Sequence, residues 1–190
     1  MLAFGHAYIF ADMRKLSMDD LGRMSKEAFK QAEKNKIVAV LDNIRSMHNV
    51  GSVFRTADAF LIEAICLCGY TPQPPHRDIH KTALGATETV DWLYYETTIA
   101  AVQDLKQRGY KVYAVEQVES SISLEKFINN ADEKIAVVFG NEVAGVDADI
   151  LPLCNGCIEI PQLGTKHSLN ISVAAGIVLW KLCEPRFSKI

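Results

Sequence analysis

The chain has 190 residues, of which 49% are hydrophobic and 23% charged, values that fit one globular domain and exclude a disordered chain or a coiled coil. Its formal net charge of −3 and sequence pI near 6.0 exclude the overall positive field of many nucleic-acid-binding proteins. Any affinity for nucleic acid must come from a local basic patch, or from patches summed across a dimer.

Residues 1–35 are predicted to form a tail and a lead-in helix. The first twelve residues are mildly apolar but lack the positive start of a signal peptide and are too short to span a bilayer, so we expect no membrane attachment. Met13 is an alternative start of the native chain. From Ser17 to Lys34, apolar residues recur at three- and four-residue spacings, which predicts an amphipathic helix.

Short apolar runs then alternate with helix-length segments. Buried strands are predicted at 37–41, 64–68, 111–115, 135–139 and 157–160. Helices are predicted at 52–60, 98–107 and 169–182, the last ending before Pro185. This order predicts one α/β domain over residues 36–190, with a mostly parallel sheet flanked by helices. The proline-containing stretch 69–87 is predicted to be a long irregular loop with a functional role.

The five cysteines are an odd number in a chain without an export signal, which indicates reduced thiols in the cytoplasm. Cys154 and Cys157 have the spacing of a metal-binding pair, but a structural zinc site needs four ligands. The other close pair, Cys66 and Cys68, lies in an apolar run where both thiols point to one face. We therefore expect buried, unreactive cysteines and no metal.

Three polar segments each follow a predicted strand, at the edge where parallel sheets bind ligands. The first is LDNIRSMHNVGSVFRTADAF, residues 41–60, in which a polar loop with Asn49 leads through Gly51 into a helix that carries Arg55. Gly51 lets the backbone pass close to a partner. Taken alone, this segment is better explained by a helix-capping Asn49 and a solvated Arg55.

The second segment is VVFGNEVAGV, residues 137–146, where glycines let a ligand approach the main chain, although a plain turn with a solvent-facing Glu142 is the usual explanation. The third is IEIPQLGTKHSLNISVAAGIVLW, residues 158–180, which brings Ser168 and Asn170 to the mouth of a helix. Free N–H groups there suit an anion. A Ser168 N-cap explains that residue but not Gly164, Lys166 or Asn170.

Together the segments resemble the three signature motifs of the SpoU/TrmH family of the SPOUT superfamily, which are RNA ribose 2′-O-methyltransferases. The matching stretches are HNVGSVFRTADAF, FGNE followed by Gly145, and IPxxGxxxSLNxSVAAGI from Ile160 to Ile177. The resemblance runs from Ile37 to the C-terminus, and Gln162 departs from it where many members carry Met. It implies that the last third of the chain forms a deep trefoil knot.

The resemblance implies S-adenosylmethionine as cofactor, with no metal, because the sulfonium already makes its methyl group electrophilic. The cofactor is expected to be held largely by main chain at these positions: Glu116 or Gln117, Gly140, Ile160 and Leu169.

Catalysis is assigned by the same resemblance to Arg55, with Asn49, Glu142, Ser168 and Asn170 arranging the ribose and phosphate. Because arginine stays protonated in proteins, we expect Arg55 to clamp the phosphate and the developing alkoxide, while an RNA phosphate or a water takes the proton. His48 and His167 are alternative proton acceptors.

For RNA binding, the candidate residues are Arg45, Arg77, His80, Lys81 and Lys166, and Tyr70 and His76 can stack on a base. The family's active site draws on both subunits of a homodimer, and the apolar last helix suits an interface. The expected substrate is tRNA or rRNA. Two alternatives are a catalytically silent RNA-binding relative, disfavoured by the intact set of site residues, and a knotted enzyme that methylates a base nitrogen, disfavoured by the SLN motif.

Overall fold

The computed structural model describes residues 14–17 and 20–187, and within them seven parallel strands form one sheet. The strands are β1 (Asn35–Asp42), β2 (Ile62–Cys68), β3 (Asp91–Tyr95), β4 (Lys111–Val115), β5 (Ile122–Ser123), β6 (Ile135–Phe139) and β7 (Gly156–Glu159). Their order across the sheet is β3-β2-β1-β6-β4-β7-β5. Because all strands are parallel, their carboxyl ends meet at one edge, which confirms the predicted α/β class.

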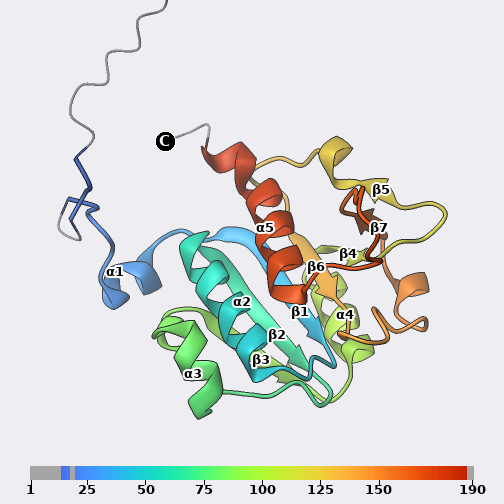
Figure 1. Ribbon diagram of the computed structural model, residues 1–190, viewed down its shortest axis with the longest axis horizontal. Helices are drawn as coiled ribbons and strands as arrows, with labels where there is room; N and C mark the ends of the chain where they lie inside the picture. Colours follow the sequence, from blue (N-terminus) through green and yellow to red (C-terminus); the bar gives the residue numbers. More distant parts are fainter. Residues whose placement is uncertain (1–13, 18–19, 188–190) are drawn as a thin grey trace, which may run out of the picture.

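The helices cover both faces of the sheet. They are α1 (Lys26–Gln31), α2 (Met47–Ala59), α3 (Arg77–Ala83), α4 (Thr98–Gln107) and α5 (Ile171–Phe187). Figure 1 shows α2 and α5 side by side on one face, with α4 on the other. Short 3₁₀ turns lie at Ala86–Glu88, Leu124–Lys126 and Leu151–Leu153.

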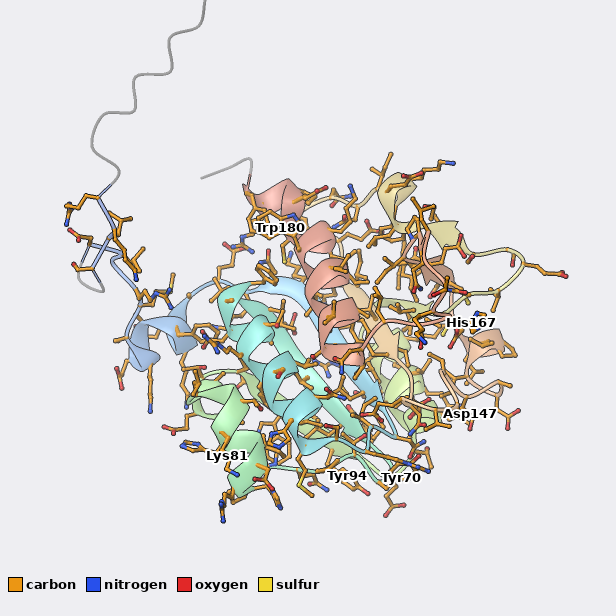
Figure 2. All side chains as sticks on the ribbon, in the orientation of Figure 1. Tyr70, Lys81, Tyr94, Asp147, His167 and Trp180 are labelled. Atoms are coloured by element: carbon orange, nitrogen blue, oxygen red, sulfur yellow. The ribbon has the colours of Figure 1, made fainter. Side chains whose placement is uncertain are left out.

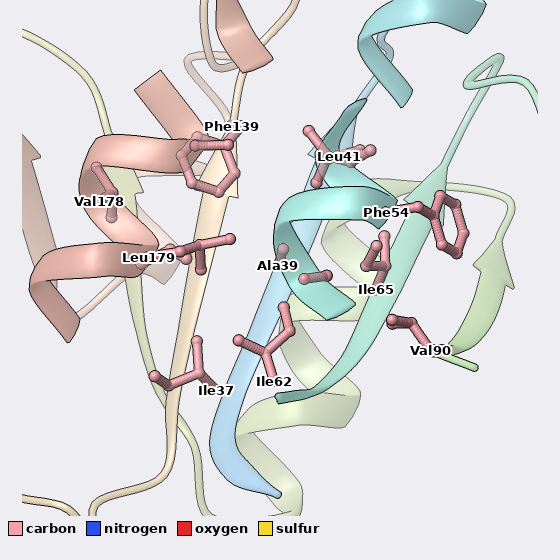
Figure 3. Packing of buried hydrophobic residues seen from close by; sticks show 14 of the residues in the cluster. Ile37, Ala39, Leu41, Phe54, Ile62, Ile65, Val90, Phe139, Val178 and Leu179 are labelled. Atoms are coloured by element: carbon pink, nitrogen blue, oxygen red, sulfur yellow. The ribbon is translucent and has the colours of Figure 1, made fainter. Parts of the chain in front are cut away.

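Alternation along β1 divides the core into two layers. Ala39 and Leu41 pack in the layer under α2 and α5, and Val40 packs in the layer under α4. Figure 3 shows side chains of the first layer, with Phe54 of α2 and Leu179 of α5 meeting the strands. All five side chains are fully buried, which explains why the central strand is a continuous apolar run.

The lead-in helix is shorter than the predicted range 17–34, since among the described residues of that range only Lys26–Gln31 is helical. Gly22 has a φ of +53°, which interrupts helical geometry. Phe29 is buried, but Leu21 and Met24 are exposed, so packing does not support a longer helix. The predicted tail of residues 1–12 and the alternative start at Met13 lie outside the described residues.

The loop predicted over 69–87 is wrong in part, because it contains α3. Packing against α2 stabilises this short polar helix: a Cβ on Gly51 would lie 2.1 Å from Thr82 Oγ1 and 2.3 Å from the Ile79 carbonyl oxygen. The close partner expected for Gly51 is therefore α3. Strands β3 and β5 were not predicted, since β3 is mostly exposed and β5 has only two residues.

Helix α5 continues through Pro185 instead of ending before it. Proline removes one helical hydrogen bond, but tertiary contacts hold the last turn in place. Arg186 Nη1 donates to the Lys34 carbonyl oxygen at 2.9 Å, and the Phe187 ring lies 6.3 Å from the Phe60 ring. Within the described residues, no helix combines the length and hydropathy needed to cross a membrane.

Candidate functional site

A cavity of about 590 Å³ opens at the carboxyl edge of the sheet, beside the ends of β4, β6 and β7 and the start of α5. This volume lies within the range of small-molecule sites in proteins. The cavity is lined by all five residues predicted to hold a cofactor, which are Glu116, Gln117, Gly140, Ile160 and Leu169. It is also lined by Glu142, Ser168 and Asn170 of the predicted catalytic set. Three segments far apart in the chain therefore share one cavity.

Tight backbone contacts shape the cavity wall at residues 140–146. A Cβ on Gly140 would lie 2.1 Å from the carbonyl carbon of Gly145, so this turn requires a glycine. The Glu116 carboxylate accepts hydrogen bonds from Val146 N at 3.0 Å and from Gln117 N at 3.0 Å. The Glu116 side chain thus ties the end of β4 to the turn after β6.

Glu142 joins this turn to the start of α2. Its carboxylate accepts hydrogen bonds from Arg45 N at 3.0 Å, Ser46 N at 3.1 Å and Asn49 Nδ2 at 2.9 Å. Partial burial by itself raises the pKa of Glu142, but the hydrogen bonds outweigh it and lower the pKa below its ordinary value. Glu142 is exposed, but its three hydrogen bonds make it an anion that organises the first segment as well as a turn residue.

The first segment differs locally from its prediction, because α2 begins at Met47 and not at 52. Ser46 caps the helix by accepting a hydrogen bond from Asn49 N at 3.3 Å, so Asn49 is not the cap. Asn49 is instead a buried residue of the first turn. This position turns its side-chain amide toward Glu142 and the start of α5.

Asn49 also connects to the third segment. Its Oδ1 accepts a hydrogen bond from Asn170 Nδ2 at 3.1 Å, and Asn170 Oδ1 in turn accepts from Ser172 N at 2.9 Å, at the first turn of α5. A chain of side chains, Glu142–Asn49–Asn170, therefore links the three segments. Ser168 is exposed at the cavity mouth, and the helix cap considered for it is provided by Asn170.

Sequence reasoning missed a buried group at the end of β1. Asp42, only 1% exposed, accepts hydrogen bonds from Thr98 Oγ1 at 2.6 Å and from Asp147 N at 3.1 Å. It therefore joins β1 to α4 and to the segment after β6. Asp42 directly follows the predicted strand, and that placement at the ligand-binding edge is the signal that identifies it.

Arg55 lies outside this hydrogen-bonded chain. It is exposed on α2, six residues after Asn49 and so about a third of a turn away from it around the helix. Helices α2 and α5 run parallel, because Asn49 bonds Asn170 near their starts and the Phe60 and Trp180 rings lie 5.8 Å apart near their ends. The structure therefore presents Arg55 to solvent and not to the cavity of its own chain.

The predicted RNA-binding residues are all exposed and come from three parts of the chain. Arg45 precedes α2, Arg77 and Lys81 belong to α3, and Lys166 lies in the segment between β7 and α5. Lys81 Nζ forms a solvated ion pair with Asp78 at 2.7 Å. His167 lines the cavity, whereas His48 lies in the first turn of α2, where its carbonyl oxygen accepts from Thr82 Oγ1.

All five cysteines lie among the described residues and are free thiols. Burial raises the pKa of Cys66 to about 12 and that of Cys154 to about 11, so neither thiol readily becomes the thiolate that a metal requires. Across the described part of the chain, no group of three or more His, Cys, Asp or Glu residues is arranged to hold a metal ion.

Fold and site together define a parallel α/β protein with a small-molecule cavity at the carboxyl edge of its sheet. The family described as SpoU rRNA Methylase matches residues 36–180, and the chain belongs to this family.

Two curated relatives illustrate the similarity. A TrmH family tRNA/rRNA methyltransferase of Staphylococcus haemolyticus is 28% identical over 164 residues, which cover 84% of this chain and 65% of the relative. The 23S rRNA (guanosine-2'-O-)-methyltransferase of Neisseria meningitidis is 29% identical over 153 residues, which cover 80% of this chain and 60% of the relative. The chain thus spans less than two thirds of the length of these relatives.

A solved structure shares the fold. The AdoMet-bound rRNA methyltransferase from Sinorhizobium meliloti superposes with a TM-score of 0.73 at 25% identity. The match covers 85% of this chain and 61% of the other.

Proposed function

We propose that this chain transfers a methyl group from S-adenosylmethionine to a ribose 2′-hydroxyl of tRNA or rRNA. The observation that carries the proposal is that the second and third motif segments line one cavity, and that Asn49 of the first segment is hydrogen-bonded to Glu142 and Asn170 of that lining. Membership of the SpoU rRNA Methylase family supports it, as does the 2'-O activity in the name of the Neisseria relative.

The cavity fits S-adenosylmethionine. Its glycine turn exposes main chain at Gly140, and Val115, Ile160 and Leu169 supply apolar surface for an adenine ring. Main-chain groups at Gln117, Ile160 and Leu169 are proposed to bind the polar atoms of the cofactor. The cofactor supplies an electrophilic methyl group, so the chemistry needs no metal.

The protein must bring a ribose hydroxyl in line with the methyl group and help remove its proton. We assign Arg55 to clamp the RNA phosphate and the developing alkoxide, because a planar guanidinium can hold two oxygens at once. Glu142 and Asn49 hold Asn170, which with Ser168 borders the cavity mouth where the ribose enters. An RNA phosphate or a water takes the proton.

The exposed position of Arg55 favours a homodimer with shared sites. Val173, Ile177 and Trp180 form an apolar stripe on the outer side of α5, and they are 49%, 39% and 54% exposed. Burial of such a stripe by a second copy is favourable. Since α5 runs beside α2, the same interface would bring Arg55 toward the partner's cavity.

The knot expected from the resemblance remains part of the proposal. Residues 116–134 contact the C-terminal segment at two points. Gln117 Nε2 donates to the carbonyl oxygen of His167, before α5, at 3.4 Å, and Asn129 Nδ2 donates to that of Leu182, in α5, at 2.9 Å. These contacts are the ones a loop around a threaded C-terminal segment would make. We also propose a cytoplasmic location, which the five free thiols favour.

Two measurements test the proposal. Calorimetry in the presence of a chelator is expected to detect S-adenosylmethionine binding, and methyl-labelled cofactor is expected to label RNA from a strain that lacks the gene. Absence of binding at millimolar cofactor, or a strict need for zinc, contradicts the cavity assignment. Binding without any labelling of RNA supports the silent relative instead. A monomer by light scattering at micromolar concentration contradicts the shared site.

A further inference from the structure

An exposed aromatic ring lies next to the candidate site. Tyr70 follows β2 at the carboxyl edge of the sheet and is 58% exposed. Its hydroxyl oxygen accepts a hydrogen bond from Asn141 Nδ2 at 3.0 Å, and its backbone N–H donates to Asn43 Oδ1 at 3.3 Å. Figure 2 shows Tyr70 at the lower edge of the molecule. Tyr70 is therefore held at its hydroxyl and at its backbone, while much of the side chain faces solvent.

The residue that holds the Tyr70 hydroxyl is itself fixed. Asn141 is only 8% exposed, and its Nδ2 also donates to the Asn43 carbonyl oxygen at 2.6 Å. Its Oδ1 accepts hydrogen bonds from Val143 N and Ala144 N. Asn141 directly precedes Glu142, which organises the start of α2. The Tyr70 ring thus has a fixed position relative to Glu142 and the carboxyl edge of the sheet.

A fixed, exposed ring is a prepared binding surface, because little side-chain entropy is lost when a ligand covers it. The Tyr70 hydroxyl accepts from Asn141, and among the described residues no acceptor takes its own proton, so it can still donate to a ligand. His76, the other ring considered for stacking, is used differently. Its Nδ1 accepts from Asp78 N at 3.2 Å and caps α3.

We propose that Tyr70 is a stacking platform for an unpaired nucleobase next to the methylated nucleotide, with Arg45 binding the adjoining phosphate. This inference rests on the proposed function and adds a substrate class to it. Bases stack on aromatic side chains when they are splayed out of single-stranded loops, which a duplex does not permit. The target nucleotide therefore lies in a single-stranded region of the RNA.

The experiment compares Tyr70→Ala with Tyr70→Phe, which keeps the ring and removes only the hydroxyl. The probe is total RNA from a strain lacking the gene, and the readouts are RNA affinity by filter binding, KM for RNA, and cofactor affinity by calorimetry. Tyr70→Ala is expected to weaken RNA binding about tenfold or more, the effect of losing one stacked base, with cofactor affinity unchanged. Tyr70→Phe is expected to stay within about threefold of wild type.

Salt dependence separates stacking from charge. Tyr70→Ala is expected to leave the slope of log affinity against log salt unchanged. Arg45→Ala is expected to make this slope shallower by about one, the contribution of one phosphate contact. RNA binding by Tyr70→Ala equal to that of wild type overturns the platform. Equal losses in Ala and Phe, accompanied by weaker cofactor binding, also overturn it, because they identify Tyr70 as a support for the turn at Asn141. If wild type binds RNA without methylating it, the proposed function fails, while the binding comparison still decides the role of Tyr70.

Discussion

The cavity has two walls of different construction. One wall consists of residues 140–146, and the segment 42–49 is hydrogen-bonded behind it through Asp42, Asn141 and Glu142. The other wall, residues 161–169, consists almost entirely of exposed residues, and Leu163 is fully exposed. The first wall is fixed before any ligand arrives. The second offers main chain and side chains that a cofactor, an RNA or a second subunit can order.

The largest effect is expected from Arg55, which belongs to neither wall. Changing Arg55 to Ala or to Lys should lower turnover by about 10²-fold or more, the usual loss for one preorganised donor, because lysine lacks the planar fork. Cofactor affinity should stay nearly unchanged, since Arg55 does not line the cavity. Labelled methyl transfer and calorimetry measure the two quantities.

The same variants separate two roles for this position. If Arg55→Lys regains activity as pH rises toward the pKa of lysine, position 55 acts as a proton acceptor and the clamp role is wrong. Full activity of Arg55→Ala contradicts the whole assignment. Mixing Arg55→Ala with a cavity variant such as Asn170→Ala should restore part of the activity if sites are shared between subunits, and none if each chain uses its own Arg55.

The contrast between the walls predicts that removing a side chain lowers the free energy of unfolding more on the fixed wall than on the open one. Asp42→Ala should lower the free energy of unfolding by about 3 kcal/mol, because Thr98 Oγ1 and Asp147 N lose their acceptor in a buried position. Ser168→Ala, the matched change on the open wall, should leave the free energy of unfolding within about 0.5 kcal/mol of the wild-type value. Urea denaturation measures both, and equal losses would remove the distinction between the walls.

A smaller effect, with a defined pH dependence, is expected for Glu142→Gln. At neutral pH the change should lower the free energy of unfolding by about 1 to 2 kcal/mol. The amide of glutamine cannot accept from Arg45 N, Ser46 N and Asn49 Nδ2 together. Since the folded pKa of Glu142 is lowered, its stabilisation is present above the ordinary pKa of glutamate and is lost as pH falls through the folded pKa. The difference between wild type and variant should therefore shrink in acid. A difference that grows in acid contradicts this role.

The smallest expected change is dynamic. S-adenosylmethionine should slow amide hydrogen exchange in residues 161–169 more than in 42–49, because locally open segments gain most from a ligand that binds their main chain. Exchange measured by mass spectrometry with and without cofactor tests this. Equal protection of both walls would show that the open wall is ordered before binding.

The same two walls explain what the sequence predicts and what it does not. The strands before the fixed wall are apolar runs, so β6 was predicted to the residue and β1 to within two residues, with Glu142 and Asn49 in the segments that follow them. The partners of these residues were not predicted, because the bonds of Asp42 to Thr98 and Asp147 span 56 and 105 positions and no local pattern encodes them.

Helix α3 and strand β3 were missed for a related reason. Helix α3 buries only Ile79 and Ala83 and is stabilised by packing against Gly51 of α2. Strand β3 lies at the sheet edge with all of its residues at least partly exposed, so it lacks the buried apolar run of a central strand. In both elements, tertiary contacts outweigh local propensity.

The most direct test of the proposed function locates the transferred methyl group on the RNA. Alkaline cleavage of RNA needs a free 2′-hydroxyl, so a methylated ribose protects the bond that follows it. After reaction with methyl-labelled S-adenosylmethionine and complete alkaline hydrolysis, the label is expected in alkali-resistant dinucleotides. Label found in mononucleotides would mean that a base is methylated, and this result would contradict ribose 2′-O-methylation.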